Sequence, residues 1–420
     1  MYQFILLFNS IGHVIPVRYL LGSFMCVQFF IGPVLAYNGL DEYQYFMYKM
    51  KVSEVQYFTY TLPAIVLFIV GLHLYAGNLK GEVVDQSRIA AFVQNNSSLP
   101  YFFIILGFSS SVIGSFFGSD LGFVFYLLGG FKFIGLFLLI LGTKQLKALA
   151  LILVLGSIIS SSLGSGMFHD LLTWIIFIGA VFAIKYKLNN NIKLVACFFF
   201  IIGAVIIQVM KGSYREATSI TGTEQAGIKT FSRLVEEKKE NHSLLSNESL
   251  ATSSIRINQG FIITNILYTV PERVPFSNGE QMYKLFEAGI LPRIIAPNKL
   301  KAGDRVIFTK YSGIPLLEGT SMGLSSVGDA YLNFGVFGGC LFMFFLGILY
   351  SGILNMFYKY GHKYPILILF SALVFYYPIR PDCEFQTILG HLFKSLFLIY
   401  MILIIWKSTF YLPAGRLSHD

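Results

Sequence analysis

Arginine side chains are the groups in this sequence best suited to chemistry, and most of them lie in one long polar segment, residues 211–333. A guanidinium group stays charged and presents a fixed fork of donors that matches the geometry of phosphate. Several converging guanidiniums can therefore bind a diphosphate and stabilise it as a leaving group without a metal ion. The arginines of this segment that stand among Gly, Pro and aromatic residues are Arg215, Arg256, Arg273, Arg293 and Arg305.

A subset of the arginines forms the candidate phosphate ligands. Arg256, Arg293 and Arg380 each adjoin an apolar or proline-bounded segment with few other charges nearby. Arg215 closely follows a predicted membrane span, so its side chain can reach the depth of the lipid headgroups. A loop arginine is more often solvated or ion-paired, and Arg233, which stands among glutamates, is expected to be of that kind.

Transfer of a group to a hydroxyl also calls for a general base, so a carboxylate or histidine is expected near the arginines. The candidates are Glu280, Asp329, Asp382, Glu384 and His391. His391 opens the last apolar segment close to Arg380, although a lone histidine is usually structural. Glu280 has a second interpretation, as the reciprocal cap of Ser277 at the start of a helix.

Tyr331 and Asn333 follow Asp329 at the head of a predicted span, where they can contact a sugar. The alternative is helix capping for the polar side chains and an interfacial aromatic belt for the tyrosine. Lys132 lies near the middle of another predicted span. It either contacts a lipid phosphate or lines a cavity, or it is a snorkelling or interhelical hydrogen-bonded lysine. The scarcity of intramembrane charge argues against an ion-coupled pump.

The elements that must position these groups are membrane helices. The chain of 420 residues is 55% hydrophobic, 16% aromatic and 13% charged, with a mean hydropathy of +0.66. These values exclude a soluble globular domain, in which charged residues approach about a quarter of the total. Apolar runs recur at the length that crosses about 30 Å of hydrocarbon as a helix. Such runs satisfy their backbone groups in lipid only when they are helical.

Charge and cysteine content exclude several other classes. The net charge of +9 is explained by the positive-inside bias of membrane proteins, so nucleic acid is not expected as a partner. Most of the cysteines lie in apolar runs, so no disulfide framework is implied. No Cys/His metal cluster, P-loop or dinucleotide fingerprint is apparent, so neither a metal nor a nucleotide cofactor is expected.

We therefore expect an all-α, polytopic integral membrane protein with about 11 transmembrane helices and one large, partly helical loop outside the membrane. The predicted spans are 2–17, 19–37, 57–76, 101–117, 121–142, 147–163, 170–186, 193–210, 334–357, 364–379 and 390–410. They divide the chain into an N-terminal bundle, the arginine-bearing loop, the C-terminal helices and a tail, at 1–210, 211–333, 334–410 and 411–420.

Lysine and arginine residues mark every second short connection, which predicts the cytoplasmic side. These residues are Arg18, Lys80, Arg88, Lys144, Lys147, Lys185, Lys187, Lys193, Lys359, Lys363 and Lys407. The pattern places the C-terminus in the cytoplasm. It places both the segment 211–333 and the loop 380–389 on the opposite side.

Local signals predict helices inside the polar segment. A capping box at 221–224 precedes an expected surface helix at 225–241, and a second box at 277–280 opens a short helix. The spacing of apolar residues predicts another helix from 254 to 270. Residues 292–304 are expected to form a loop.

The layout resembles the Wzy-type oligosaccharide repeat-unit polymerases, broadly the O-antigen polymerase and ligase family. The shared features are many spans, one large late loop and arginines within it, and residues 16–37 are similar to the amino-terminal pattern of one branch. Short matches to its loop pattern follow in order. They are Arg256-x-Asn258, Val274-Pro275 with Gly279-Glu280-x-x-Tyr283, Pro292-Arg293 with Pro297-x-Lys299, and Gly328-Asp329-Ala-Tyr331-x-Asn333-Phe334-Gly335. The pattern has Glu where this chain has Asp329.

This resemblance implies a glycosyltransferase of the bacterial inner membrane that makes O-antigen, capsule or exopolysaccharide, with its large loop in the periplasm. The implied reaction moves a growing glycan from undecaprenyl diphosphate onto the non-reducing end of a lipid-linked repeat unit. Arg256, Arg293 and Arg380 would bind the diphosphate, and no cofactor is implied. The implied partners are the lipid-linked oligosaccharide, a chain-length regulator and a repeat-unit flippase.

Other functions remain open at this point. A ligase of the same superfamily would transfer finished polysaccharide onto a different acceptor. A flippase or exporter would move the lipid-linked sugar without cutting a bond, and it predicts charged groups along a central transmembrane cavity instead of a cluster at the outer boundary. A structural partner in an envelope-synthesis complex is a further possibility.

Overall fold

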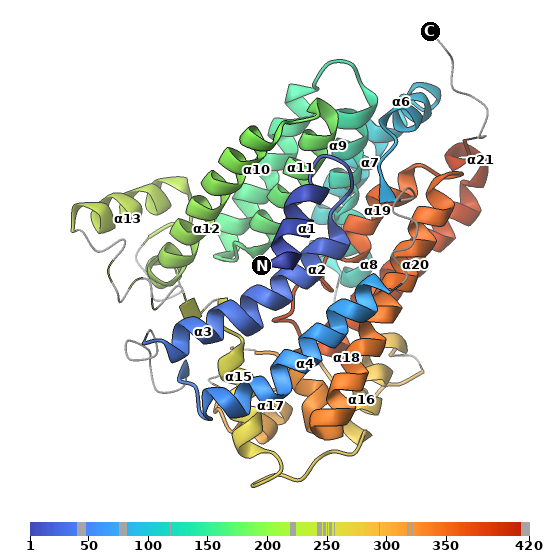
Figure 1. Cartoon of the computed structure of the whole chain (residues 1–420). Coiled ribbons are helices and arrows are strands. Elements are labelled where there is room, and N and C mark those ends of the chain that lie inside the picture. The colour runs from blue at the N-terminus through green and yellow to red at the C-terminus, as the bar shows by residue number, and fades with distance from the viewer. Residues whose placement is uncertain are drawn as a thin grey trace.

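The computed structural model of the chain describes residues 1–412 except for 40–47, 75–81, 118, 219–223, 242–245, 247–248, 250, 252–253, 256, 294, 317–319 and 321. Its elements are helices, accompanied by one isolated antiparallel bridge between Val14 and Val83 (Figure 1). Nine helical stretches of the described chain are long and apolar enough to cross a membrane. The architecture is that of a polytopic helical membrane protein, as the composition predicts.

Several of these stretches are continuous helices and others are built in series. The continuous ones are α4 (Glu54–His73), α10 (Ala148–Ser165), α11 (His169–Tyr186), α12 (Asn190–Thr218) and α20 (Phe385–Ile405). The serial ones are α2 (Val17–Cys26) with a π-helix and α3 (Gly32–Tyr37), α7 (Leu99–Ile113) with a 3-10 turn, and α8 (Ser119–Gly129) with α9 (Phe131–Gly142). The remaining stretch, α18 (Ser325–Gly361), is interrupted by Gly335, whose backbone is non-helical with φ 65°.

The expected number of spans is not reached by the described helices, because two of them are short. α1 (Tyr2–Ser10) and α19 (Ile366–Val374) have 9 residues each and stand where the first and tenth spans are predicted. A helix of that length rises only about 14 Å, less than half of the hydrocarbon thickness. α19 ends at Val374, and the chain continues as turns through Pro378 to α20.

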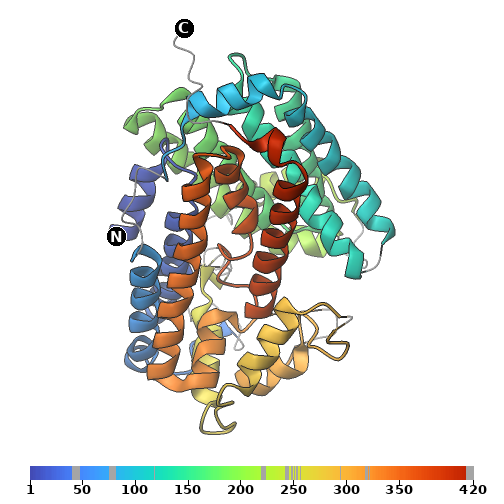
Figure 2. The ribbon, with the colours of Figure 1, turned by 90° about the vertical axis from the view of Figure 1, so that its right-hand side faces the viewer.

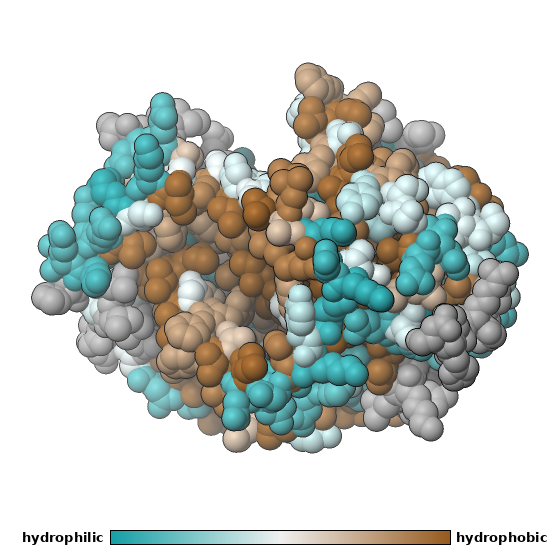
Figure 3. Space-filling model, turned by 90° about the horizontal axis from the view of Figure 1, so that it is seen from above, coloured by the Kyte–Doolittle hydropathy of each residue, from teal (hydrophilic) through white to brown (hydrophobic). Residues whose placement is uncertain are grey.

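The connections sort into two ends of the molecule as the charge pattern predicts. At the upper end of Figure 1, Arg88 donates hydrogen bonds to the backbone oxygens of His362 and Leu412, and Lys185 Nζ donates to the Thr143 oxygen at 2.6 Å. Seen from above in Figure 3, hydrophilic side chains gather along the left and lower edges of this end, and hydrophobic ones surround a hollow near its middle.

The polar segment contributes helices to the opposite, lower end. These helices are α15 (Gly260–Thr269), α16 (Glu280–Ile290) and α17 (Arg305–Ser312), and α13 (Ile228–Glu240) lies to one side (Figure 1). The helices expected at 225–241 and 277–289 are thus present, whereas the box at 221–224 lies largely outside the described residues. Figure 2 shows α16 beneath the long helices α18 and α20. α17 is an addition to the expected pattern, and Asp304 caps it with its side chain.

A close contact between α4 and α18 forms the most extensive helix pair. A methyl group at Gly71 would collide with the Phe344 carbonyl oxygen, and one at Gly347 would collide with the Phe68 carbonyl oxygen. Because both glycines lack a side chain, the two backbones touch directly, which maximises dispersion contact between helices in lipid. We call this contact the glycine seam.

The position of Arg18 contradicts one prediction from the sequence, because the residue lies in a helix and not in a cytoplasmic loop. It lies in α2, is 1% exposed, and its Nε forms an ion pair with Glu82 at 2.7 Å. Its other nitrogens donate to the Leu72 oxygen, to Ser351 Oγ at 2.8 Å and to Asn355 Oδ1 at 3.0 Å. Arg18 thus connects α2 to α4 and α18 through buried hydrogen bonds.

Candidate functional site

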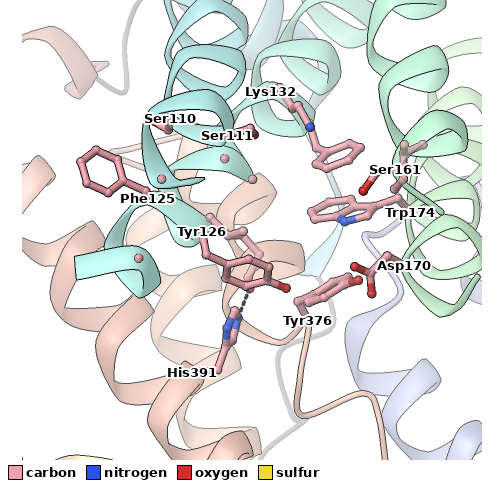
Figure 4. A pocket seen from close by; sticks show the side chains of 17 residues that line it. Ser110, Ser111, Phe125, Tyr126, Lys132, Ser161, Asp170, Trp174, Tyr376 and His391 are labelled. Atoms are coloured by element: carbon pink, nitrogen blue, oxygen red, sulfur yellow. Dashed lines mark hydrogen bonds between the residues drawn. The ribbon is translucent and has the colours of Figure 1, made fainter. Parts of the chain in front are cut away.

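A cavity of about 300 Å³ lies among α7 to α11, α19 and α20. It contains most of the polar groups that the membrane helices leave accessible to a ligand, and Figure 4 shows them pointing toward one another. The side chains that can do chemistry there are Tyr126, Lys132, Ser161, Asp170, Tyr376 and His391. We call this space the main cavity, and its walls come from both the N-terminal bundle and the last helices.

Several glycines line the main cavity. Gly114, Gly122, Gly129 and Gly130 all line it, so four positions on its wall carry no side chain. Gly130 separates α8 from α9, and a methyl group there would collide with Leu373 of α19. At Gly114 and Gly129 too, a methyl group would press on a neighbouring side chain, so these glycines allow close packing around the cavity.

His391 is the predicted candidate base that the structure places in the main cavity. Its ring is 1% exposed, and Nε2 donates a hydrogen bond to the Leu373 carbonyl oxygen at 2.8 Å. Because a carbonyl oxygen only accepts, this bond fixes the proton on Nε2 and leaves Nδ1 as the acceptor of the neutral ring. Nδ1 is buried and has no partner among the described residues. A buried acceptor without a partner is unusual and suits proton transfer from a ligand.

Arg380 lies beside the same cavity and is only loosely paired. Its Nη atoms are 3.8 Å from Asp170 and 3.9 Å from Asp382, beyond normal hydrogen-bond length, and its side chain is 19% exposed. Its Nε is buried without a partner in the described chain, as is one oxygen of Asp382. The guanidinium also lies over the ring of Tyr377, 5.2 Å from the centroid. The charge is therefore held in place with donor capacity left over.

Lys132 adds a second cation to the main cavity. It belongs to α9, and its Nζ lies 5.3 Å from the ring centroid of Phe108 and 5.5 Å from that of Phe133. Of the two sequence interpretations, the cavity-lining one therefore holds. Aromatic faces stabilise a cation that has left water, and they leave its three donors available.

The side chains of Tyr331 and Asn333 make hydrogen bonds within the protein. Asn333 Oδ1 accepts a hydrogen bond from the Met282 backbone nitrogen at 3.0 Å, and its Nδ2 donates to the Asp329 carbonyl oxygen at 2.8 Å. The Tyr331 hydroxyl donates to the Val270 oxygen at 3.2 Å. Both side chains are buried. Asn333 thus caps α16 from another helix, a form of the capping alternative, and neither residue lines the main cavity.

Asp329 forms a separate buried carboxylate pair with Glu384. Asp329 is 3% exposed and faces the backbone N–H of Phe385 at the start of α20. Glu384 accepts hydrogen bonds from the Gly303 nitrogen at 2.8 and 2.9 Å. Burial raises the pKa of Glu384 above its ordinary value, against the effect of these hydrogen bonds. The space beside this pair is about 30 Å³, room for about one water molecule and too small for a sugar.

Glu280 is on the surface. Its side chain is 72% exposed and forms an ion pair with Lys284 at 2.6 Å, one turn along α16. Ser277 Oγ accepts from the Gln281 nitrogen at 2.8 Å, but the helix begins at Glu280 with Gly279 as its N-cap, so the predicted capping box is not formed. The Glu280 side chain pairs with Lys284 instead of reaching back to Ser277. Glu280 is therefore not brought to the other candidates.

The remaining predicted arginines lie outside the main cavity. Arg215 is exposed near the end of α12, and its Cγ lies 2.9 Å from where a methyl group on Gly166 would be. Arg293 is exposed on the loop after α16. Arg256 lies outside the described residues. The structure thus brings Arg380 and His391 together, but not the full set of arginines.

Sequence reasoning missed Asp170 and the tyrosines of the main cavity. The Asp170 carboxylate lies at the start of α11, and the Tyr376 hydroxyl points toward it (Figure 4). Asp170 is the acid in a turn without lysine or arginine, which is the signal that could have marked it. Trp174 also lines the cavity, but its ring stacks on Phe133 at 3.8 Å and on Tyr376 at 5.3 Å, so its faces are covered.

Among the described residues, no group of three or more His, Cys, Asp and Glu side chains is placed to hold a metal ion. The chain matches no family model, no curated protein and no solved structure. The arrangement of the main cavity is therefore the basis for a functional proposal. Its lining offers one cation, one carboxylate, one neutral imidazole acceptor and phenol groups, and Arg380 lies beside it near Asp170.

Proposed function

We propose that the chain is a membrane glycosyltransferase that polymerises a lipid-linked oligosaccharide. The growing glycan would pass from undecaprenyl diphosphate to the non-reducing end of a second lipid-linked repeat unit. The single observation that carries the proposal is that His391 and Lys132 line the main cavity and Arg380 lies beside it, over the same Tyr377 ring that packs against His391. Two cations with spare donor capacity, Lys132 and Arg380, within apolar helices suit a substrate that has a diphosphate at the end of a long apolar tail.

The histidine and the two cations have different roles in the proposed reaction. The bond between the sugar anomeric carbon and the diphosphate oxygen breaks, and a bond from that carbon to the acceptor hydroxyl oxygen forms. The hydroxyl proton passes to Nδ1 of His391, whose Nε2 proton is held by the Leu373 oxygen. Arg380 and Lys132 stabilise the negative charge that stays on the diphosphate. No metal is needed for this balance of charge.

The proposal includes a sidedness. The main cavity lies toward the end that contains residues 164–170 and 380–384, and the basic connections are gathered at the other end. By the positive-inside rule the basic end is cytoplasmic. We therefore propose a bacterial inner-membrane protein with residues 211–333 in the periplasm and the C-terminus in the cytoplasm. Arg256 remains a proposed diphosphate ligand of that periplasmic segment.

A flippase is the second candidate, because Lys132 and Asp170 line a cavity between helices, as a pathway for a lipid-linked sugar would require. A ligase of the same superfamily has the same chemistry with a different acceptor. The three functions differ in which bonds change and in what second substrate they need.

Reconstitution in proteoliposomes separates them. The protein is given an undecaprenyl-diphosphate-linked repeat unit alone, and the products are resolved by size. A ladder of multiples of the repeat supports the polymerase. Transfer that starts only when a lipid A core acceptor is added would identify a ligase. Movement of the lipid-linked unit across the bilayer, with every bond intact, would overturn the proposal in favour of a flippase.

A further inference from the structure

A second cavity, of about 600 Å³, opens at the basic end of the molecule, away from the main cavity. It is lined by parts of the loop after α1, the segment before α6 (Gln86–Asn95), the end of α11 and the start of α12. The Val84 nitrogen donates a hydrogen bond to the His13 oxygen at 2.9 Å, and the bridge between Val14 and Val83 joins the same two segments. The cavity is thus built by tertiary contacts of four separate segments.

Lys193 is the central group of this cavity. It lies in the first turn of α12 and is 6% exposed, and its Nζ has no hydrogen bond or ion pair in the part of the chain that the structure describes. Its stem passes Gly12, whose φ of +93° favours glycine and whose missing side chain leaves the room: a methyl group there would be 3.3 Å from Nζ. An ammonium group is costly to bury without a partner, so an anion is expected beside it.

The rest of the cavity lining favours negative charge. Lys187 at the end of α11 and His13 on the loop after α1 are both exposed at its rim. The lining carboxylate, Asp85, is engaged in capping α6, where it accepts hydrogen bonds from Ser87 and from the Arg88 nitrogen. Lys193 itself stands in the N-terminal turn of α12, where the helix dipole also favours an anion.

The geometry points to a phosphate-binding site in this cavity, with Lys193 as the buried ligand and Lys187 and His13 at the rim. A phosphate group has enough charge and acceptor oxygens to engage all three. The cavity lies where apolar helices end, which is the depth of lipid headgroups. The phosphate can therefore be the headgroup of an anionic lipid or a free phosphate, and both present the same chemistry.

The test uses the full-length protein purified in an uncharged detergent. Saturable binding is measured by titration calorimetry with inorganic phosphate, with dihexanoyl phosphatidic acid, and with dihexanoylglycerol, which has no phosphate. Wild-type protein is expected to bind at least one phosphate probe and not dihexanoylglycerol. Binding of phosphatidic acid alone identifies a lipid site, and binding of inorganic phosphate alone identifies a free-ion site.

Variants then assign the site. Lys193→Gln is expected to weaken binding by about tenfold or more, as loss of a charge-assisted hydrogen bond implies. The matched control is Lys147→Gln, an exposed lysine at the same end, which should leave affinity unchanged. If Lys193→Gln does not fold, Lys187→Gln replaces it, with an expected loss of about threefold. No saturable binding by wild type, or equal affinity in the Lys193 or replacement Lys187 variant and wild type, overturns the site.

Discussion

Arg18 and Arg380 are both held among membrane helices, yet their surroundings differ in how completely they satisfy the charge. Every nitrogen of Arg18 donates a hydrogen bond, and its carboxylate partner Glu82 is as buried as it is. Arg380 has a buried Nε without a partner in the described chain and carboxylates only at 3.8 and 3.9 Å. A fully satisfied arginine is part of the framework, whereas an incompletely satisfied one retains capacity for an anion.

The largest effect is expected from removing the satisfied arginine. Arg18→Ala leaves Glu82 buried and uncompensated, which should lower the free energy of unfolding by about 3–5 kcal/mol. The measurement is denaturant unfolding of the purified protein in detergent. Arg18→Met combined with Glu82→Leu removes both charges and should recover most of that loss. A single variant as stable as wild type would contradict the structural role of the pair.

Removing the unsatisfied arginine should act on rate instead of stability. Arg380→Ala is expected to lower the rate of chain extension by about 10²–10³-fold, as loss of one donor to a developing anion does. Arg380→Lys should also be poor, because a point charge does not replace the planar fork. The control is Arg293→Ala, whose exposed position predicts a smaller loss. Equal losses in the two alanine variants would remove the distinction between them.

The His391→Gln variant tests whether the imidazole in the main cavity acts as the base. The glutamine amide can still donate to the Leu373 oxygen, but it has no basic nitrogen in place of Nδ1. Extension should slow by about 10²-fold, with the thermal midpoint of unfolding unchanged. The pH–rate profile supplies the further test. The rise in rate with pH that the wild-type imidazole produces should be absent in the variant, and its persistence would exclude His391 as the base.

Glu384 predicts a smaller effect, on pH dependence. Its pKa is raised in the folded state, so it stabilises the fold at pH values below its ordinary value of 4.5, and that contribution is lost as pH rises through the raised pKa. Glu384→Gln should flatten the fall in unfolding temperature over this pH interval. Thermal unfolding from pH 4 upward measures it, and parallel curves for both proteins would contradict the assignment.

The smallest effect is expected at Glu280, the predicted catalytic carboxylate that the structure places on the surface. Glu280→Gln breaks an exposed ion pair with Lys284, and such pairs contribute little that can be measured. Extension by this variant should equal that of wild type in the same ladder assay. A strong loss would show that Glu280 reaches the substrate and that the main cavity is not the whole site.

Much of the fold follows from the sequence, because hydropathy alone determines which segments cross lipid. The helices at 280–290 and 228–240 were also predictable from local caps and spacing. The number of spans was not, since the turns after α1 and before Pro378 shorten two apolar runs. Arg18 was misassigned to a loop because its partner Glu82 is distant in sequence and nothing local announces the pair.

The candidate site was predictable only in part. His391 and Arg380 are close in sequence, so their proximity in space could be inferred. Asp170 and Lys132 reach them through tertiary packing of α9 and α11, which no local pattern encodes. Asn333 was wrongly predicted to contact a ligand, because a polar residue at the head of a span suggests such a contact. Its use as a cap for α16 depends on a helix far away in the chain.

The glycine seam makes α4 and α18 one rigid unit. Two backbones in contact at Gly71 and Gly347 have no compressible side chains between them, so neither helix can move without the other. Neither helix lines the main cavity, so a rearrangement that admits a ligand is expected among the helices that do, where α8 and α9 meet at Gly130. A bulky residue at Gly71 is expected to separate α4 from α18, and one at Gly130 to collide with Leu373 of α19.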